Sequence, residues 1–248
     1  MTSETGHAKN VAKFEELISF CTGYGTAYNP TKSSIKIVAM NTLLTNVRNT
    51  LQTVKATKTV YDNATNAREI AFANLKKLST RVVNALGATD AVKQTVDDAK
   101  TINRKIQGKR ADNIKTLPVT PPAEGTTPTE VIQISVSQQS YDSLIDNFSK
   151  LIVSVTAEPL YIPNETDLKV TALNTLLTNL KTSNTAVINA TPSYRSAIIT
   201  RNTTLYQPAT GLVDTALEVK KYVKSVFGAR SQQYAEISGL EFKKLKKL

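Results

Sequence analysis

The chain has little of what catalysis and metal binding require. Its 248 residues contain one histidine, one cysteine and no tryptophan. A disulfide framework needs at least two cysteines, and a zinc site of cysteine and histidine needs more ligands than His7 and Cys21 supply. These architectures are therefore excluded by composition, and we expect neither a cofactor nor a metal site.

Long apolar stretches are also missing. No run of 18 apolar residues occurs, so no membrane-spanning helix is expected. The opening residues Met1–His7 are polar and lack the apolar core of a secretory signal. We therefore expect a cytoplasmic protein, and a single free cysteine fits that reducing compartment.

The few residues that could do chemistry are badly placed for it. His7 lies in an N-terminal segment that we expect to be floppy, and Cys21 follows Phe20 near the end of an apolar helix. Activating Cys21 as a nucleophile would need a base, and only His7 is available. The adjacent carboxylates of Glu15–Glu16 and Asp97–Asp98 diverge on a helix instead of converging as an acid–base pair. We expect no catalytic residues, no small-molecule substrate and no enzymatic activity.

What the sequence does contain is an internal duplication. Residues 41–46 read Asn-Thr-Leu-Leu-Thr-Asn, and the same six residues recur at 174–179, an offset of 133. At this offset Tyr28 aligns with Tyr161 without a gap, and other tyrosine, proline and arginine positions align as well. A six-residue identity with aligned flanks indicates two copies of one unit.

The ends of the copies align at a different offset. Gly108 and its basic neighbours resemble Gly228 and its neighbours, 120 residues later. The difference from 133 predicts that the second copy has lost about 13 residues, near the turn at Gly87.

A proline-rich stretch separates the copies. Residues 117–128 include four prolines and a glycine, a composition that ends helices and favours extended chain. Residues 131–136 alternate in part between apolar and polar side chains, a pattern that is compatible with a short strand. An extended segment laid against a bundle is the favoured interpretation. We therefore predict a first helical repeat at 1–112, a Pro/Thr-rich linker at 113–137, and a second repeat with a basic tail at 138–248.

Apolar residues in both copies recur in steps of three and four, which is the heptad seam of a packed helix. The seam of the first copy is Ile37, Met40, Leu44, Val47, Leu51 and Val54, continuing to Tyr61. The seam of the second copy is Val170, Leu173, Leu177, Leu180, Val187 and Tyr194, interrupted by Asn184. Thr191–Pro192 reads as the start of a new helix, and by analogy a break is expected near Thr59–Asn63.

Further helices complete each copy. Leading helices are expected at 11–21 and 141–155, and later ones at 72–86, 89–107 and 212–226, ended by Gly87, Gly108 and Gly228. The predicted fold class is all-α, with two homologous four-helix up-and-down bundles in tandem.

The net charge of +11 is concentrated near the ends of the two copies. Residues 100–116 hold six basic residues and one acidic residue, and residues 220–248 hold eight basic and two acidic residues. Cations in a last helical turn offset the helix dipole, but those beyond the helix are also typical of polyanion binding. The candidate polyanion-binding residues are Arg104, Lys105, Lys109, Arg110, Lys220, Lys221, Lys224, Arg230, Lys243 and Lys244.

The end of the second copy carries a Phe-Gly pair at 227–228, followed by Ser231 and Tyr234. This pattern resembles the ending of uncharacterised bacterial helical proteins, including tandem-repeat ones. The resemblance implies a helical fold and no particular activity. The last residues, 242–248, alternate apolar and basic residues and are expected to form a frayed, solvated tail.

These observations favour a non-enzymatic structural or protein-interaction module that associates with a protein partner or with itself. The alternative is non-specific nucleic-acid binding through the two basic clusters, which contain no recognisable base-reading motif.

Overall fold

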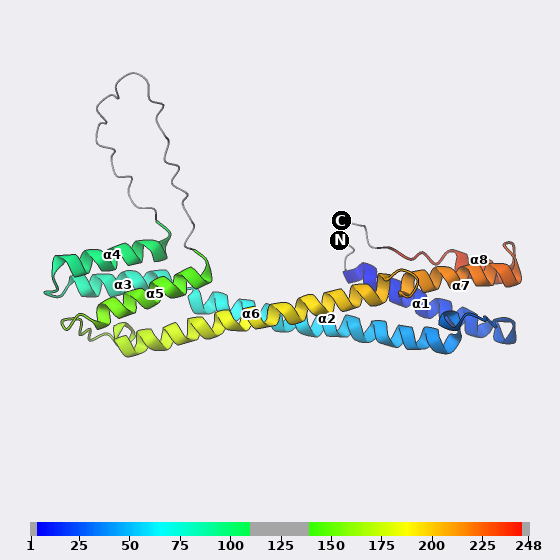
Figure 1. Cartoon of the computed structure of the whole chain (residues 1–248), viewed down its shortest axis with the longest axis horizontal. Coiled ribbons are helices and arrows are strands. Elements are labelled where there is room, and N and C mark those ends of the chain that lie inside the picture. The colour runs from blue at the N-terminus through cyan, green and yellow to red at the C-terminus, as the bar shows by residue number, and fades with distance from the viewer. Residues whose placement is uncertain (1–3, 110–138, 245–248) are drawn as a thin grey trace, which may run out of the picture. The chain divides into compact units, whose positions relative to one another are not determined.

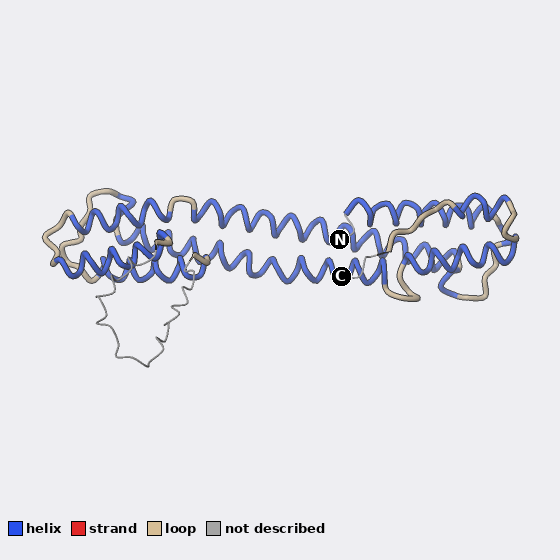
Figure 2. Tube along the Cα trace, turned by 90° about the horizontal axis from the view of Figure 1, so that it is seen from above, coloured by secondary structure: helices blue, strands red, loops and turns tan. Residues whose placement is uncertain are grey.

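The structure, a computed structural model, describes residues 4–109 and 139–244. Within those ranges all regular elements are helical, so the all-α prediction is confirmed there (Figures 1 and 2). The α-helices are α1 (Glu4–Gly23), α2 (Ile37–Phe72), α3 (Leu75–Gly87), α4 (Lys93–Gln107), α5 (Tyr141–Thr156), α6 (Val170–Tyr206), α7 (Leu212–Phe227) and α8 (Gln232–Ser238). Short 3₁₀ turns are η1 (Gly25–Ala27), η2 (Ser33–Ile35) and η3 (Thr166–Leu168).

Most residues of the predicted seams, which lie on the long helices α2 and α6, face the interior of the protein. Leu44 is 5% exposed and Leu177 is 8% exposed. The other buried seam residues are Met40, Val47, Val54, Leu173, Leu180 and Val187. Threonine and asparagine are poor helix formers, so burial of these apolar side chains stabilises α2 and α6 more than local propensity does.

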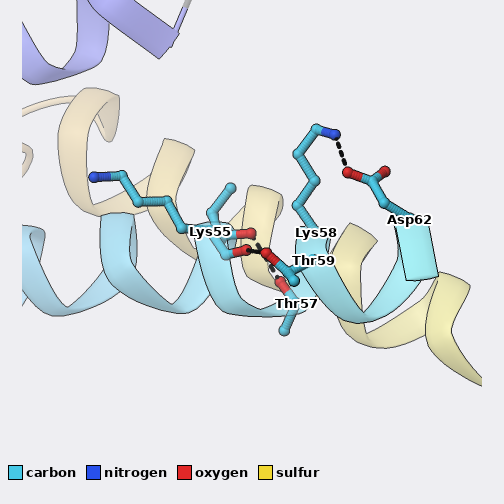
Figure 3. A network of polar contacts seen from close by, with 6 residues as sticks. Lys55, Thr57, Lys58, Thr59 and Asp62 are labelled. Atoms are coloured by element: carbon cyan, nitrogen blue, oxygen red, sulfur yellow. Dashed lines mark hydrogen bonds and ion pairs between the residues drawn. The ribbon is translucent and has the colours of Figure 1, made fainter.

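The expected break near Thr59–Asn63 is wrong, because α2 continues as one helix to Phe72. Threonine hydroxyls in this stretch donate to carbonyls one turn earlier, as Thr57 does to Thr53 and Thr59 to Lys55. Figure 3 shows this region, where the Lys58 ammonium lies 2.5 Å from the Asp62 carboxylate on the next turn. These contacts between successive turns are compatible with an unbroken helix.

The expected helix start at Thr191–Pro192 is also wrong, because Pro192 lies inside α6. An interior proline removes one backbone hydrogen bond and costs about 3 kcal/mol. Val187 and Ala190 are buried before it, and Ala197 is buried after it. Packing of the same face on both sides of Pro192 explains why the helix continues.

The chain forms two compact units that differ from the predicted domains. Unit 1 comprises Met1–Asp62 with Asn189–Leu248, and unit 2 comprises Asn63–Ile188. The predicted bounds 1–112 and 138–248 therefore do not coincide with the units, because each unit takes helices from both halves of the sequence. The physical reason is that α2 and α6 do not break. The predicted linker, 113–137, and the extended segment at 131–136 lie outside the described residues.

Unit 1 is built around α1, α7 and α8, with the first part of α2 and the last part of α6. Its largest fully buried side chains are Phe14, Leu17, Met40, Leu205 and Leu212. Two of these come from α1 and two from α6 and α7, so residues about 200 positions apart share one core.

Unit 2 is built around α3, α4 and α5, with the remaining parts of α2 and α6. Phe148 and Leu151 of α5 pack with Leu86 of α3 and Ile106 of α4. Asn184, which interrupts the predicted seam, is buried here. Its side-chain amide donates to Asp142 at 2.8 Å and accepts from Arg68 at 3.1 Å, so the interruption is a satisfied polar contact.

Candidate polyanion-binding surface

The first predicted basic cluster lies at the end of α4, in unit 2. Arg104 and Lys105 are in the last turn of α4, and Lys109 follows Gly108, whose φ of 75° ends the helix as predicted. Arg110 lies outside the described residues. Cations at this position offset the helix dipole, and this effect explains Arg104 and Lys105 without a ligand.

The second predicted cluster lies in unit 1. Lys220, Lys221 and Lys224 are on α7, Arg230 is in the turn before α8, and Lys243 and Lys244 follow α8. The ammonium of Lys224 lies 5.7 Å from the ring centroid of Tyr234. The two predicted clusters thus belong to different units.

Residues 239–244, which we call the strap, run back from α8 toward the first turns of α1 (Figure 1). Leu240 is buried and Phe242 is half-buried against the unit 1 core. The backbone N–H of Lys243 donates to the Asn10 side-chain oxygen at 3.0 Å, and the Asn10 amide donates to the Lys243 carbonyl at 2.9 Å. The expected frayed tail is therefore wrong for residues 242–244, because these contacts dock it.

Two lysines hold the strap from either side. The Lys13 ammonium, on α1, donates to the carbonyl of Glu241 at 3.0 Å. The Lys220 ammonium, on α7, donates to the carbonyls of Ser238 and Leu240, both at 2.8 Å. Partial burial and then the nearby charge of Lys13 lower the pKa of Lys220, while Glu241 opposes that shift. Because the carbonyls that Lys13 and Lys220 bind belong to the neighbouring residues Glu241 and Leu240, two positive charges meet at this point of the strap.

No charge pattern along the sequence indicates that α1 belongs to this basic region. Lys9 precedes Lys13 by one turn, so both lie on the same face of α1. More than 200 residues separate them from the strap, and neither residue stands in a charged run. Only the packing of α1 against α7 and α8 brings them there.

Two carboxylates accompany these lysines. Asp214 accepts from the backbone N–H of Ala209 at 3.1 Å and pairs with Lys244 at 3.3 Å. The backbone hydrogen bond, followed by Lys244 and Lys221, holds the pKa of Asp214 below its usual value, so Asp214 stays ionised near neutral pH. We call the set Lys9, Lys13, Lys220, Lys221, Lys243 and Lys244, with Asp214 and Glu241, the strap surface.

The described residues of the two units also differ in charge. Residues 4–62 and 189–244 hold 15 lysines and arginines against 8 aspartates and glutamates, a net charge of +7. Residues 63–109 and 139–188 hold 12 against 9, a net charge of +3. The basic excess therefore lies mostly in unit 1, which is a division that the sequence order does not suggest.

The expectation of a floppy segment around His7 is wrong, and Cys21 lies near the end of α1 as predicted. His7 is 1% exposed, and its Nδ1 lies 2.7 Å from the Tyr206 hydroxyl. The pairing of α1 with the end of α6 orders this residue. Cys21 is buried, and its burial raises the pKa of the thiol to about 12. A thiol with that pKa is a poor nucleophile near neutral pH.

One member of each adjacent carboxylate pair is bound by a basic side chain. Glu15 pairs with Arg48 at 2.5 Å, and Asp97 pairs with Lys100 at 3.0 Å. Among the described residues, no group of three histidine, cysteine or acidic side chains is arranged to hold a metal ion. Within the same ranges, no helix has the length and apolarity that crossing a membrane requires.

Comparisons of the chain with known proteins found no match. No family model matches the sequence, and no curated protein and no solved structure matches it either. The resemblance to uncharacterised bacterial tandem helical proteins, the cytoplasmic location and self-association therefore stay predictions.

Proposed function

We propose that the protein is a non-enzymatic interaction module that binds the phosphate backbone of nucleic acid through the strap surface. The observation that supports this proposal is that Lys13 of α1 and Lys220 of α7 both donate to strap carbonyls, while Lys244 of the strap pairs with Asp214. Lys9 lies one turn before Lys13, and Lys221 and Lys243 are the sequence neighbours of Lys220 and Lys244. Lysines gathered on one face attract a polyanion and release its bound counterions. The proposal places the site in unit 1 and gives the α4 cluster a helix-terminal role only.

A nucleic acid fits this surface better than an anionic membrane does. Membrane-surface binding needs exposed apolar side chains that enter the lipid. Among the large apolar side chains that are exposed in the described residues, none lies on α1 or on the strap, and only Val226 lies on α7. The half-buried Phe242 packs on the core, so it does not offer a free face for base stacking. We therefore expect binding to duplex backbone without sequence preference.

The test compares two charge-matched triple variants in titrations of a short DNA duplex at increasing salt. The first variant removes Lys9, Lys221 and Lys243 by Lys→Gln changes, and the control removes Lys36, Lys55 and Lys169 in the same way. All six side chains are exposed. Loss of three phosphate contacts should make the slope of log affinity against log salt shallower by about 2–3 units. The control should change the slope much less.

Failure of the wild-type protein to bind at low salt would overturn the proposal. Equal weakening in both variants would also overturn it, since only the total charge would then matter. Vesicles of anionic lipid form a parallel arm, and tighter binding to vesicles than to DNA would favour a membrane-surface role instead.

The proposal also retains the predicted duplication as the origin of the two units. Tyr28 donates to the Ile35 carbonyl at 2.6 Å, and Tyr161 donates to the Leu168 carbonyl at 2.9 Å. These are the same bond at positions 133 apart. The later helices support a different alignment from the predicted one. Leu75 and Leu212 begin α3 and α7, 137 residues apart, and η2 contacts α7 as η3 contacts α3.

Pairing α3 with α7 removes the need for a 13-residue loss near Gly87. The pairing aligns the buried positions of the two helices, which are Leu75 with Leu212, Ser79 with Ala216, Val82 with Val219 and Leu86 with Val223. The shortened element of the second copy is then α8, which stands where α4 stands in the first copy.

A further inference from the structure

The strap carries two of the six lysines of the strap surface, yet neutral groups supply much of its attachment. Asn10 pairs with both backbone groups of Lys243, and Leu240 is buried in the core. Lys13 and Lys220 donate to the strap carbonyls of Glu241 and Leu240. The position of the strap therefore decides where Lys243 and Lys244 lie relative to α1 and α7.

The docked strap leaves a local excess of positive charge. Lys13 and Lys220 repel each other, and Lys244 has Asp214 as its ionic partner at 3.3 Å. A phosphate held between the strap and these two lysines would offset that repulsion, because opposite charges at short range are attractive even in a partly solvated site. Binding and docking should therefore favour each other.

We propose that docking of the strap assembles the phosphate-binding site, with Asn10 as the positioning residue and the nucleic-acid backbone as the ligand. This inference rests on the proposed function of the strap surface. Linkage requires reciprocity: if docking strengthens binding, then bound nucleic acid stabilises the docked strap by the same factor. Asn10 is uncharged and buried, so it acts by holding Lys243 and not by touching phosphate.

The test uses the full-length protein with Asn10→Ala, which keeps the net charge at +11. This variant should bind a short DNA duplex about five- to tenfold more weakly than wild type at moderate salt, with a slope of log affinity against log salt shallower by about 2 units. The matched control is Asn46→Ala, since Asn46 is exposed on α2. The control should bind as wild type does.

A second measurement does not depend on the variant. The amide of Lys243 donates to Asn10, so its hydrogen exchange reports directly on docking. In wild-type protein, saturating duplex should slow exchange across residues 240–243 about five- to tenfold, matching the loss of affinity in Asn10→Ala.

The outcomes separate the two proposals. If wild-type protein does not bind DNA, then the proposed function fails. If wild type binds but Asn10→Ala binds equally well with its strap released, then the positioning role of Asn10 is overturned while the proposed function stands. If Asn10→Ala does not fold, then the exchange measurement decides, and unchanged exchange in the presence of duplex overturns the inference.

Discussion

Units 1 and 2 share a similar arrangement of helices but differ in the last element that packs onto it. In unit 2 the closing element is α4, a helix of 15 residues that packs on α3 and α5. In unit 1 the element in the corresponding place is α8, with only seven residues, followed by the strap. A helix satisfies most of its carbonyls internally, whereas an extended segment must find donors elsewhere. The strap finds them in Lys13, Lys220 and Asn10, so the shorter closing helix explains why lysines gather in unit 1.

The aromatic contacts beside the two leading helices also differ between the units. In unit 2 the Phe72 and Tyr141 rings meet edge to face at 4.8 Å, and the Arg68 guanidinium lies 3.9 Å from the Tyr141 ring centroid. In unit 1 the corresponding pair is Tyr206 and His7, joined by a 2.7 Å hydrogen bond. Both units thus pair two rings at this place, with a cation–π contact added in unit 2 and a hydrogen bond between the rings in unit 1.

An ion pair between α3 and η3 in unit 2 has a counterpart between α7 and the residue before η2 in unit 1, with the charges exchanged. Arg81 pairs with Asp167 in unit 2, and Glu218 pairs with Lys32 in unit 1. Exposed pairs of this kind contribute little to stability, so the sign of each partner is free to change. The units are therefore alike in their buried contacts and unlike in their surface charge.

The largest effect expected from a matched pair of changes is in the cores. Phe14→Ala in α1 and Phe148→Ala in α5 each remove a fully buried ring and should lower the free energy of unfolding by about 3–5 kcal/mol. Urea unfolding measures the loss, and Val38→Ala, at a side chain that is 80% exposed, should stay within about 0.5 kcal/mol of wild type. A loss below about 1 kcal/mol at either phenylalanine would contradict the assignment of equivalent cores.

A smaller effect should distinguish the units at high pH. Burial raises the pKa of Cys21 from 9.0 to about 12, so the stability from its neutral form is complete below pH 9 and is lost as pH rises toward 12. Cys21→Val installs the side chain found at Val155, the position that the predicted duplication pairs with it. The variant should lose less stability than wild type between these pH values in urea unfolding. An unchanged pH dependence would show that Cys21 contributes nothing to it.

Burial also raises the pKa of Tyr28 in unit 1 and raises that of Tyr161 in unit 2 to about 12. Both tyrosines remain in the Cys21→Val variant, so part of the loss of stability at high pH should persist. Amide exchange above pH 9 should therefore accelerate first in the helices around Cys21, where both a thiol and a phenol ionise only on unfolding.

The smallest effect expected is at the paired tyrosines. Tyr28→Phe and Tyr161→Phe each leave one buried carbonyl without its hydroxyl donor and should cost about 1 kcal/mol each. Because the two bonds lie in different units, the double variant should show the sum of the single losses. A strong departure from additivity in urea unfolding would indicate that the two bonds are not independent.

Most helices could be predicted from the sequence, but the packing of the chain could not. Steps of three and four placed Leu44 and Leu177 in the interior, and Gly108 and Gly228 marked true helix ends. The break expected at Pro192 failed because a proline signal is local, whereas burial on both sides of it is not. For the same reason the ordered position of His7 could not be predicted, because it depends on a contact with Tyr206, which is 199 positions away in the sequence.

The basic site shows this limit most clearly. Clusters at the ends of the copies were visible as charge runs, and four of their residues belong to the strap surface: Lys220, Lys221, Lys243 and Lys244. Lys9 and Lys13 could not be found, since two lysines on one face of a helix are ordinary in sequence. No signal along the chain states which distant segment will lie beside them.

The helical period, the interior faces and the helix-ending glycines follow from the order of residues, because these features depend on neighbours within a few turns. The unbroken course of α2 and α6, the packing of α1 with α7 and α8, and the contact of the strap with Lys13 arise from the packing of segments far apart in the chain. Those choices depend on which apolar faces bury one another across most of the chain, and a local pattern is compatible with more than one such pairing.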